Sequence, residues 1–133
     1  MWLLKTEPSE FSYEDLAKRG EAVWDGVTNP AALKNLKAMR QGDLVLIYHT
    51  GEEKAVVGVA EVSREAYPDV KAKDPRRVVV DVRPIRRLAS PVSLATIKSL
   101  AVFASSPLVR QGRLSVVPLS AAQWKAIDAR GGA

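Results

Sequence analysis

The chain has no cysteine and only one histidine, His49, among its 133 residues. The absence of cysteine excludes disulfides, thiol nucleophiles and Cys-based zinc sites. A single histidine also excludes a His-rich metal centre. We therefore expect no metal ion to be bound.

Long hydrophobic runs are missing as well. The apolar start of the chain ends at Lys5, too soon for a signal peptide, and no later run approaches the ~20 apolar residues of a membrane-spanning helix. The composition, 47% hydrophobic and 26% charged, is that of an ordinary folded protein. We expect a soluble, cytoplasmic protein that makes no membrane contact, with one domain over residues 1–133 and a monomeric state favoured.

The common signatures of enzymes are also absent. There is no Gly-x-Gly-x-x-Gly, no phosphate-cradling Gly-Lys-Ser/Thr loop, no Gly-x-Ser-x-Gly and no metal-ligand spacing. A Ser–His–Asp arrangement would need His49 with Asp25 or Asp43, and nothing fixes a nucleophilic serine on a strained turn. His49 ends a buried strand pattern, where it is either structural or a ligand contact at a pocket rim. We expect no catalysis and no cofactor.

Periodicity predicts short strands alternating with short helices. The expected strands cover residues 2–5, 43–49, 55–62, 77–86 and 114–119. The expected helices cover residues 12–19, 30–41, 93–100 and 120–130, and Gly131 and Gly132 should end the last one. The strand at 43–49 is apolar on both faces and so should be central. Gly58 indicates a bulge or a close approach by another segment, and residues 64–75 read as a polar loop. Antiparallel pairing of these strands predicts a small α+β, barrel-like domain.

The net charge of +5 is unevenly distributed. Residues 1–40 carry six basic and six acidic side chains, so the excess lies later in the chain. A basic surface of this kind is either a phosphate-facing surface or simply a solvated face with salt bridges. Arg110 and Arg113 flank a glycine in an expected loop, and arginine suits phosphate or a base edge. The candidate phosphate-binding residues are Lys34, Arg76, Arg77, Arg86, Arg110 and Arg113.

Trp24 is the most distinctive of the three tryptophans. Trp2 in a strand and Trp124 on a helix face are expected core residues. Trp24 instead lies among turn-forming residues, where it is either core or a binding residue on a loop. An indole face can stack on a nucleobase, and Thr6, Asn29 and the amides around Gly26 could read the edge of the stacked ring.

At these residues the chain resembles EVE-domain proteins of the PUA-like group, which also includes the YTH readers of methylated adenine in RNA. The resemblance rests on Trp2–Pro8, Trp24–Asn29, Tyr48–His49, Val57–Val62, Ala66–Asp69 and Arg113–Leu119. These motifs run in order from the first expected strand to the last, so the resemblance covers nearly the whole chain.

The resemblance implies an α+β, PUA-like open barrel of mixed, mainly antiparallel strands with flanking short helices. It also implies a pocket for a modified base flipped out of its strand. By similarity to YTH readers, Trp24 would form one wall of an aromatic cage, with Lys5 and Thr6 on its floor. YTH cages have further tryptophans, whereas the chain after Val62 offers only Tyr67, which leaves modified cytosine or another base open. The candidate pocket residues are Lys5, Thr6, Glu7, Trp24, Asp25, Gly26, Val27, Asn29, Tyr48, His49 and Tyr67.

The function we predict is non-catalytic reading of a modified base in DNA or RNA. In this view phosphate contacts position the strand and the pocket specifies the base. Two alternatives remain at this point. One is an enzyme acting on a nucleic acid or nucleotide through His49 or Asp25, and the other is a protein-interaction module with a basic face.

Overall fold

The framework is one six-stranded sheet in the order β2-β5-β4-β3-β1-β6. The structure is a computed structural model that describes residues 1–131. Its strands are β1 (Trp2–Thr6), β2 (Ala22–Trp24), β3 (Leu44–His49), β4 (Ala55–Pro68), β5 (Val78–Ser93) and β6 (Val116–Pro118). β1 and β3 pair in parallel and the other neighbours pair antiparallel. The mixed, mainly antiparallel α+β prediction is confirmed.

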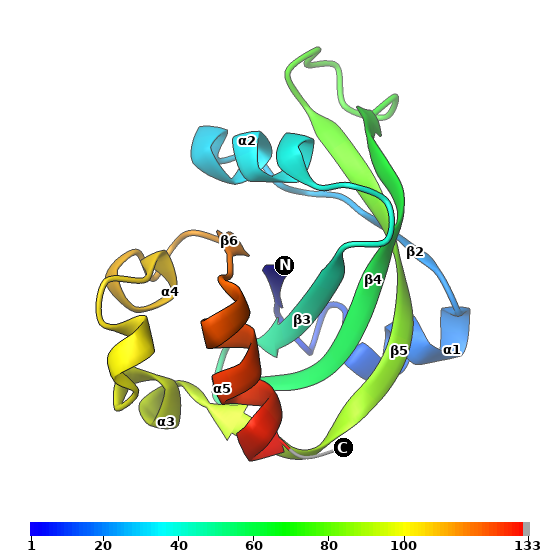
Figure 1. Cartoon of the computed structure of the whole chain (residues 1–133). Helices are drawn as coiled ribbons and strands as arrows, with labels where there is room; N and C mark the ends of the chain where they lie inside the picture. Colours follow the sequence, from blue (N-terminus) through cyan, green and yellow to red (C-terminus); the bar gives the residue numbers. More distant parts are fainter. Residues whose placement is uncertain (132–133) are drawn as a thin grey trace.

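Short helices surround this sheet, which curls into a half-barrel (Figure 1). They are α1 (Tyr13–Arg19), α2 (Pro30–Ala38), α3 (Leu94–Lys98), the 3-10 helix η1 (Ala101–Phe103), α4 (Pro107–Arg110) and α5 (Ala121–Gly131). In Figure 1, α1 lies on one side of the β4–β5 ribbon and the other labelled helices lie on the opposite side. The loop at residues 69–77 joins these two strands and rises beside α2, and we call it the ribbon loop.

The helix starts follow the capping residues in the sequence. Ser12 accepts from the amide of Asp15, whose carboxylate accepts in return from the amide of Ser12, so the capping box is complete. Asn29 caps α2 ahead of Pro30. That helix ends at Ala38, whereas the sequence suggested an end at Gly42. The predicted stop of the last helix includes Gly132, which lies outside the described residues.

β3 is an inner strand with both faces covered. It pairs with β4 on one side and β1 on the other, and residues 45–49 are all buried. The prediction of a central strand is therefore confirmed. Its unbroken apolar run is the expected pattern for a strand without a solvent face.

The β4–β5 ribbon is longer than predicted at both ends. The expected loop at 64–75 is wrong for residues 64–68, because Tyr67 and Pro68 pair with Val79 and Val78. β5 also continues past Arg86 to Ser93, where it pairs with the start of β4. Several register shifts interrupt this pairing, and such irregularities break the simple alternation on which the prediction relied.

The placement of Trp24 in a loop was wrong. Residues 22–24 form β2, and Trp24 pairs with Val80 of β5. Trp24 is 7% exposed and belongs to the core. Trp2 and Trp124, which we expected in the core, are only partly buried and pack against it. A three-residue edge strand has too few residues to show a period, so tertiary pairing decided its structure.

Gly58 lets α1 pack directly against β4. A Cβ at this position would lie 2.4 Å from a ring carbon of Tyr13, closer than any real contact. The Tyr13 hydroxyl then donates to the carbonyl of Val59 at 2.7 Å. The pairing of β4 with β5 also shifts between Val56 and Gly58. Both readings of this glycine, bulge and close approach, are confirmed.

We predict that Gly58→Ala destabilises the protein by about 1–3 kcal/mol, the usual cost of overpacking a core, because the Tyr13 ring must move. Chemical denaturation measures the change. Gly112→Ala is the matched control: a Cβ there meets nothing within 4 Å, so its stability should stay within about 0.5 kcal/mol of the parent. Equal stability of the two variants would contradict the packing argument.

Candidate functional site

A cavity of about 730 Å³ opens beside Trp24, and we call it the Trp24 cavity. It lies between the end of β1 with the following turn, the end of α1, β2 with the residues after it, and the ribbon loop. Its lining residues are Lys5, Thr6, Glu7, Glu10, Phe11, Arg19, Glu21, Ala22, Val23, Trp24, Asp25, Gly26 and Lys71. Its size is within the usual range for ligand sites.

Two aromatic rings form one corner of the Trp24 cavity. The centroids of Phe11 and Trp24 are 5.9 Å apart and their planes are 80° apart, an edge-to-face contact. The guanidinium carbon of Arg19 lies 5.1 Å from the Phe11 centroid. Trp24 makes this contact and pairs through β2, and it forms an apolar wall of the cavity.

Lys5 and Thr6 bring polar groups to the cavity from the end of β1. The Lys5 ammonium donates to the carbonyl of Gly112 at 2.9 Å and lies 5.7 Å from the Tyr48 ring centroid. Partial burial lowers the pKa of Lys5 from its usual value. The Thr6 hydroxyl donates to the carbonyl of Phe11 at 2.7 Å, which leaves its oxygen lone pairs as acceptors.

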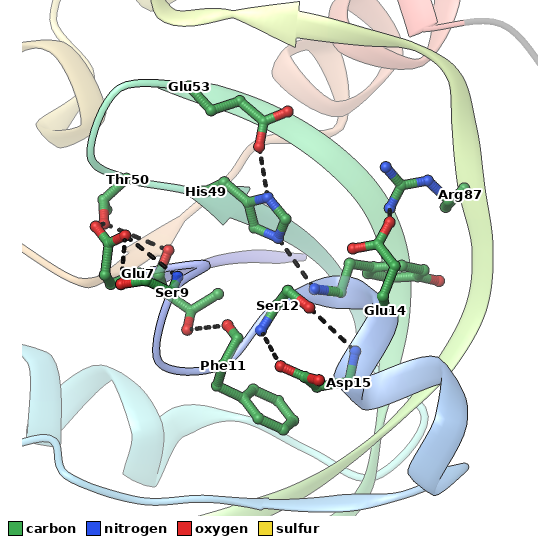
Figure 2. Close-up of polar contacts among 12 residues, drawn as sticks. Glu7, Ser9, Phe11, Ser12, Glu14, Asp15, His49, Thr50, Glu53 and Arg87 are labelled. Atoms are coloured by element: carbon green, nitrogen blue, oxygen red, sulfur yellow. Dashed lines mark hydrogen bonds and ion pairs between the residues drawn. The ribbon is translucent and has the colours of Figure 1, made fainter.

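Glu7 is a fixed carboxylate at the cavity edge. It accepts from the amide and hydroxyl of Ser9 and from the hydroxyl of Thr50, as Figure 2 shows. The hydrogen bond from the Ser9 amide is the main reason that the pKa of Glu7 is lowered. The carboxylate lies beside Gly51, where an added Cβ would be 2.7 Å from Oε2.

The cavity lining carries both signs of charge. Four carboxylates, Glu7, Glu10, Glu21 and Asp25, face three cations, Lys5, Arg19 and Lys71. Such a lining can accept hydrogen bonds from amino groups and donate them to carbonyl or phosphate oxygens. This suits a polar, flat ligand better than an apolar one.

Five predicted pocket residues do not line the Trp24 cavity. Val27 and Tyr48 are buried in the core, and Asn29 caps α2 through its side-chain oxygen. The Tyr67 hydroxyl contacts Asp81 at 2.5 Å, and the Arg64 guanidinium carbon lies 3.8 Å from the Tyr67 ring centroid. Burial is the main reason that the pKa of Tyr67 is raised to about 12, with the Asp81 hydrogen bond second.

His49, the fifth, has both ring nitrogens engaged (Figure 2). Its Nε2 accepts from the backbone amide of Tyr13 at 3.0 Å, and its Nδ1 lies 2.6 Å from Oε1 of Glu53. An Nε2 that accepts carries no proton, so Nδ1 is the donor to Glu53. The side chain is buried and outside the cavity. This geometry does not present His49 to a substrate as an acid or base.

The predicted phosphate-binding residues separate into groups. Lys34, Arg76 and Arg77 line a second cavity of about 400 Å³, described below. Arg86 forms an ion pair with Asp128 of α5. Arg110 donates to the carbonyl of Ala104 at 2.9 Å, and both it and Arg113 are exposed and line neither cavity.

Within residues 1–131, no group of three or more His, Asp or Glu side chains is placed to hold a metal ion. In the same part of the chain no helix has the length and apolar character needed to cross a membrane.

The family model of the EVE domain matches residues 1–129. The chain belongs to the EVE domain family. Mouse thymocyte nuclear protein 1 is 31% identical, over 90% of this chain and 68% of the relative. A Rhodopseudomonas palustris protein solved by NMR is 40% identical with a TM-score of 0.92, over 98% of this EVE domain and 92% of that chain.

A crystal structure of human THYN1 in complex with DNA containing 5-methylcytosine is also similar to this EVE domain. The two are 27% identical with a TM-score of 0.91, over 99% of this chain and 97% of that chain. Together with the curled sheet, these neighbours confirm the PUA-like fold predicted from the sequence.

Sequence reasoning missed several cavity residues of this EVE domain, chiefly Phe11, Arg19 and Lys71. Phe11 precedes the capping box, where a hydrophobic residue ordinarily packs on its own helix. Lys71 comes from a loop 47 positions beyond Trp24 in the chain. The pairing of β2 with β5 and of β5 with β4 brings Trp24 and the ribbon loop together. No local sequence pattern indicates such pairing.

We predict that His49→Ala destabilises this EVE domain by about 1–3 kcal/mol, because the amide of Tyr13 loses its acceptor. Thermal and urea unfolding measure the change. Glu53→Gln is the companion control: its amide oxygen still accepts from Nδ1, so its stability should change by less than about 0.5 kcal/mol. Parent-like stability of His49→Ala would show that the contact with Tyr13 is dispensable.

Proposed function

We propose that this EVE domain is a non-catalytic reader of a modified base in a nucleic-acid strand, and that the base stacks against Trp24. The observation that carries the proposal is a ligand-sized cavity with an aromatic corner, Trp24 and Phe11, in a fold shared with human THYN1 bound to methylated DNA. Stacking on an aromatic side chain contributes ~1–3 kcal/mol per base.

The polar lining supports reading of the edge of the base. A base taken out of its stack exposes all its donors and acceptors, which a pocket can then test individually. Carboxylates suit an exocyclic amino group, which cytosine and adenine carry. Because human THYN1 was solved with 5-methylcytosine DNA, modified cytosine in DNA is the ligand to test first.

The environment of His49 supports the non-catalytic part of the proposal. The only histidine is buried, with one nitrogen accepting from Tyr13 and the other bonded to Glu53. The carboxylates of the Trp24 cavity remain as acceptors for a bound ligand. Binding without turnover is therefore the simplest use of this lining.

The test compares binding of oligonucleotides that carry one 5-methylcytosine with binding of unmodified strands, using the parent and Trp24→Leu. Leucine is preferred to alanine, because truncating a buried tryptophan to alanine costs about 3–5 kcal/mol of stability. We expect Trp24→Leu to weaken binding of the modified strand roughly 10- to 100-fold and to remove the preference for it.

The matched control is Trp124→Leu, which removes a half-buried tryptophan of α5 that lines neither cavity. It should lower stability yet keep the preference for the modified base. Thermal unfolding confirms that each variant is folded at the assay temperature. A parent protein without any preference among modified strands, or sustained conversion of the oligonucleotide that His49→Ala abolishes, would refute the reader proposal.

A further inference from the structure

A second cavity of about 400 Å³ lies between α2 and the ribbon loop, and we call it the Lys34 groove. Four cationic side chains line it: Lys34, Lys37, Arg76 and Arg77. Asp74 is its one carboxylate. Lys34 and Lys37 are three residues apart on α2 and therefore share one helix face.

The charges of the Lys34 groove do not cancel. Arg76 binds Asp74 through two nitrogens, at 3.1 and 2.9 Å, and this contact lowers the pKa of Asp74 to about 2. At neutral pH that pair is neutral overall. Within residues 1–131, Lys34, Lys37 and Arg77 form no ion pair with a carboxylate. The groove thus keeps three uncompensated positive charges.

The Lys34 groove also has apolar lining residues. Pro30 and Leu33 of α2 line it together with the cations, and Thr28 adds a hydroxyl. A simple inorganic anion would leave these apolar residues without a partner. A sugar–phosphate backbone has both parts needed here, an apolar sugar face and charged phosphate oxygens.

The same two chain segments line the Lys34 groove and the Trp24 cavity. The segment after β2 supplies Gly26 to the cavity and Thr28 to the groove, and the ribbon loop supplies Lys71 to one and Arg77 to the other. Gly26 and Thr28 are two residues apart, so their Cα atoms are at most about 7.6 Å from each other. Neighbouring residues of one segment therefore line both cavities.

From this continuity we infer that the Lys34 groove binds the sugar–phosphate backbone next to the base held in the Trp24 cavity. The inference rests on the proposed function and specifies its ligand: a strand with at least one flanking nucleotide, rather than a free nucleoside. Lys37 is the residue it adds to the phosphate contacts. Arg86, Arg110 and Arg113 lie outside this path.

The test uses Lys34→Gln/Lys37→Gln and a single-stranded DNA dodecamer with one central 5-methylcytosine, its unmodified match, and free 5-methyl-2′-deoxycytidine. We expect the double variant to bind the dodecamer at least about tenfold more weakly at low salt. Each lost phosphate contact on a single strand lowers the slope of log affinity against log salt by about 0.7, so the slope should fall by about 1.4. Nucleoside binding, followed by NMR, should not change.

Lys98→Gln/Lys125→Gln is the matched control, since both lysines are exposed and line neither cavity. It removes the same charge and should leave the salt slope at the parent value. Parent-like binding of the dodecamer by Lys34→Gln/Lys37→Gln would overturn the inference. So would an equal loss in both double variants, or equally strong competition by polyglutamate.

The inference and the proposed function fail in different ways. If the parent binds modified and unmodified dodecamers equally, and only the Lys34/Lys37 variant loses affinity, the groove binds backbone and the reading of a modified base is wrong. If the parent prefers the modified strand and the Lys34/Lys37 variant keeps its full affinity and salt slope, the reader stands and the groove is not its backbone site. Absence of any oligonucleotide binding overturns both.

Discussion

The contact between Tyr13 and Gly58 fixes the arrangement on which the candidate site depends. The Tyr13 ring packs on the one position of β4 without a Cβ, its hydroxyl bonds to Val59, and its amide bonds to His49. These three contacts hold the start of α1 against the sheet. Phe11 lies two residues earlier, so the same contacts determine where it meets Trp24. A structural tyrosine thereby sets the aromatic corner of a cavity that it does not line.

The two cavities differ in the charge of their linings. The Trp24 cavity combines four carboxylates with three cations, a lining suited to the mixed donors and acceptors of a base edge. The Lys34 groove has a clear excess of positive charge together with apolar lining residues, which suits binding to a nucleic-acid backbone without regard to its sequence. The modest net charge of the chain does not show this difference, because four carboxylates line the Trp24 cavity whereas the single carboxylate of the Lys34 groove, Asp74, is paired with Arg76.

Much of the fold follows from local patterns, and the site follows only in part. The capping residues at Ser12 and Asn29 and the glycine at position 58 have local physical causes, so the sequence shows them. β2 forms because it pairs with β5, and residues 64–68 join β4 because they also pair with β5. Sequence patterns are read over short stretches of the chain, so they do not reveal pairing between segments that lie far apart in it. For the same reason six predicted pocket residues line the cavity, whereas Asn29 and His49 serve as structural partners instead.

Trp24 is both a core residue and a wall of the cavity, and this limits how the domain can change over evolutionary time. Its burial and its pairing in β2 tie it to folding, so its replacement is costly whatever the ligand. Glu21, Asp25 and Lys71 line the same cavity but are exposed, and surface substitutions of this kind cost little stability. Preference for one ligand over another can therefore diverge through these exposed positions while the aromatic wall stays the same.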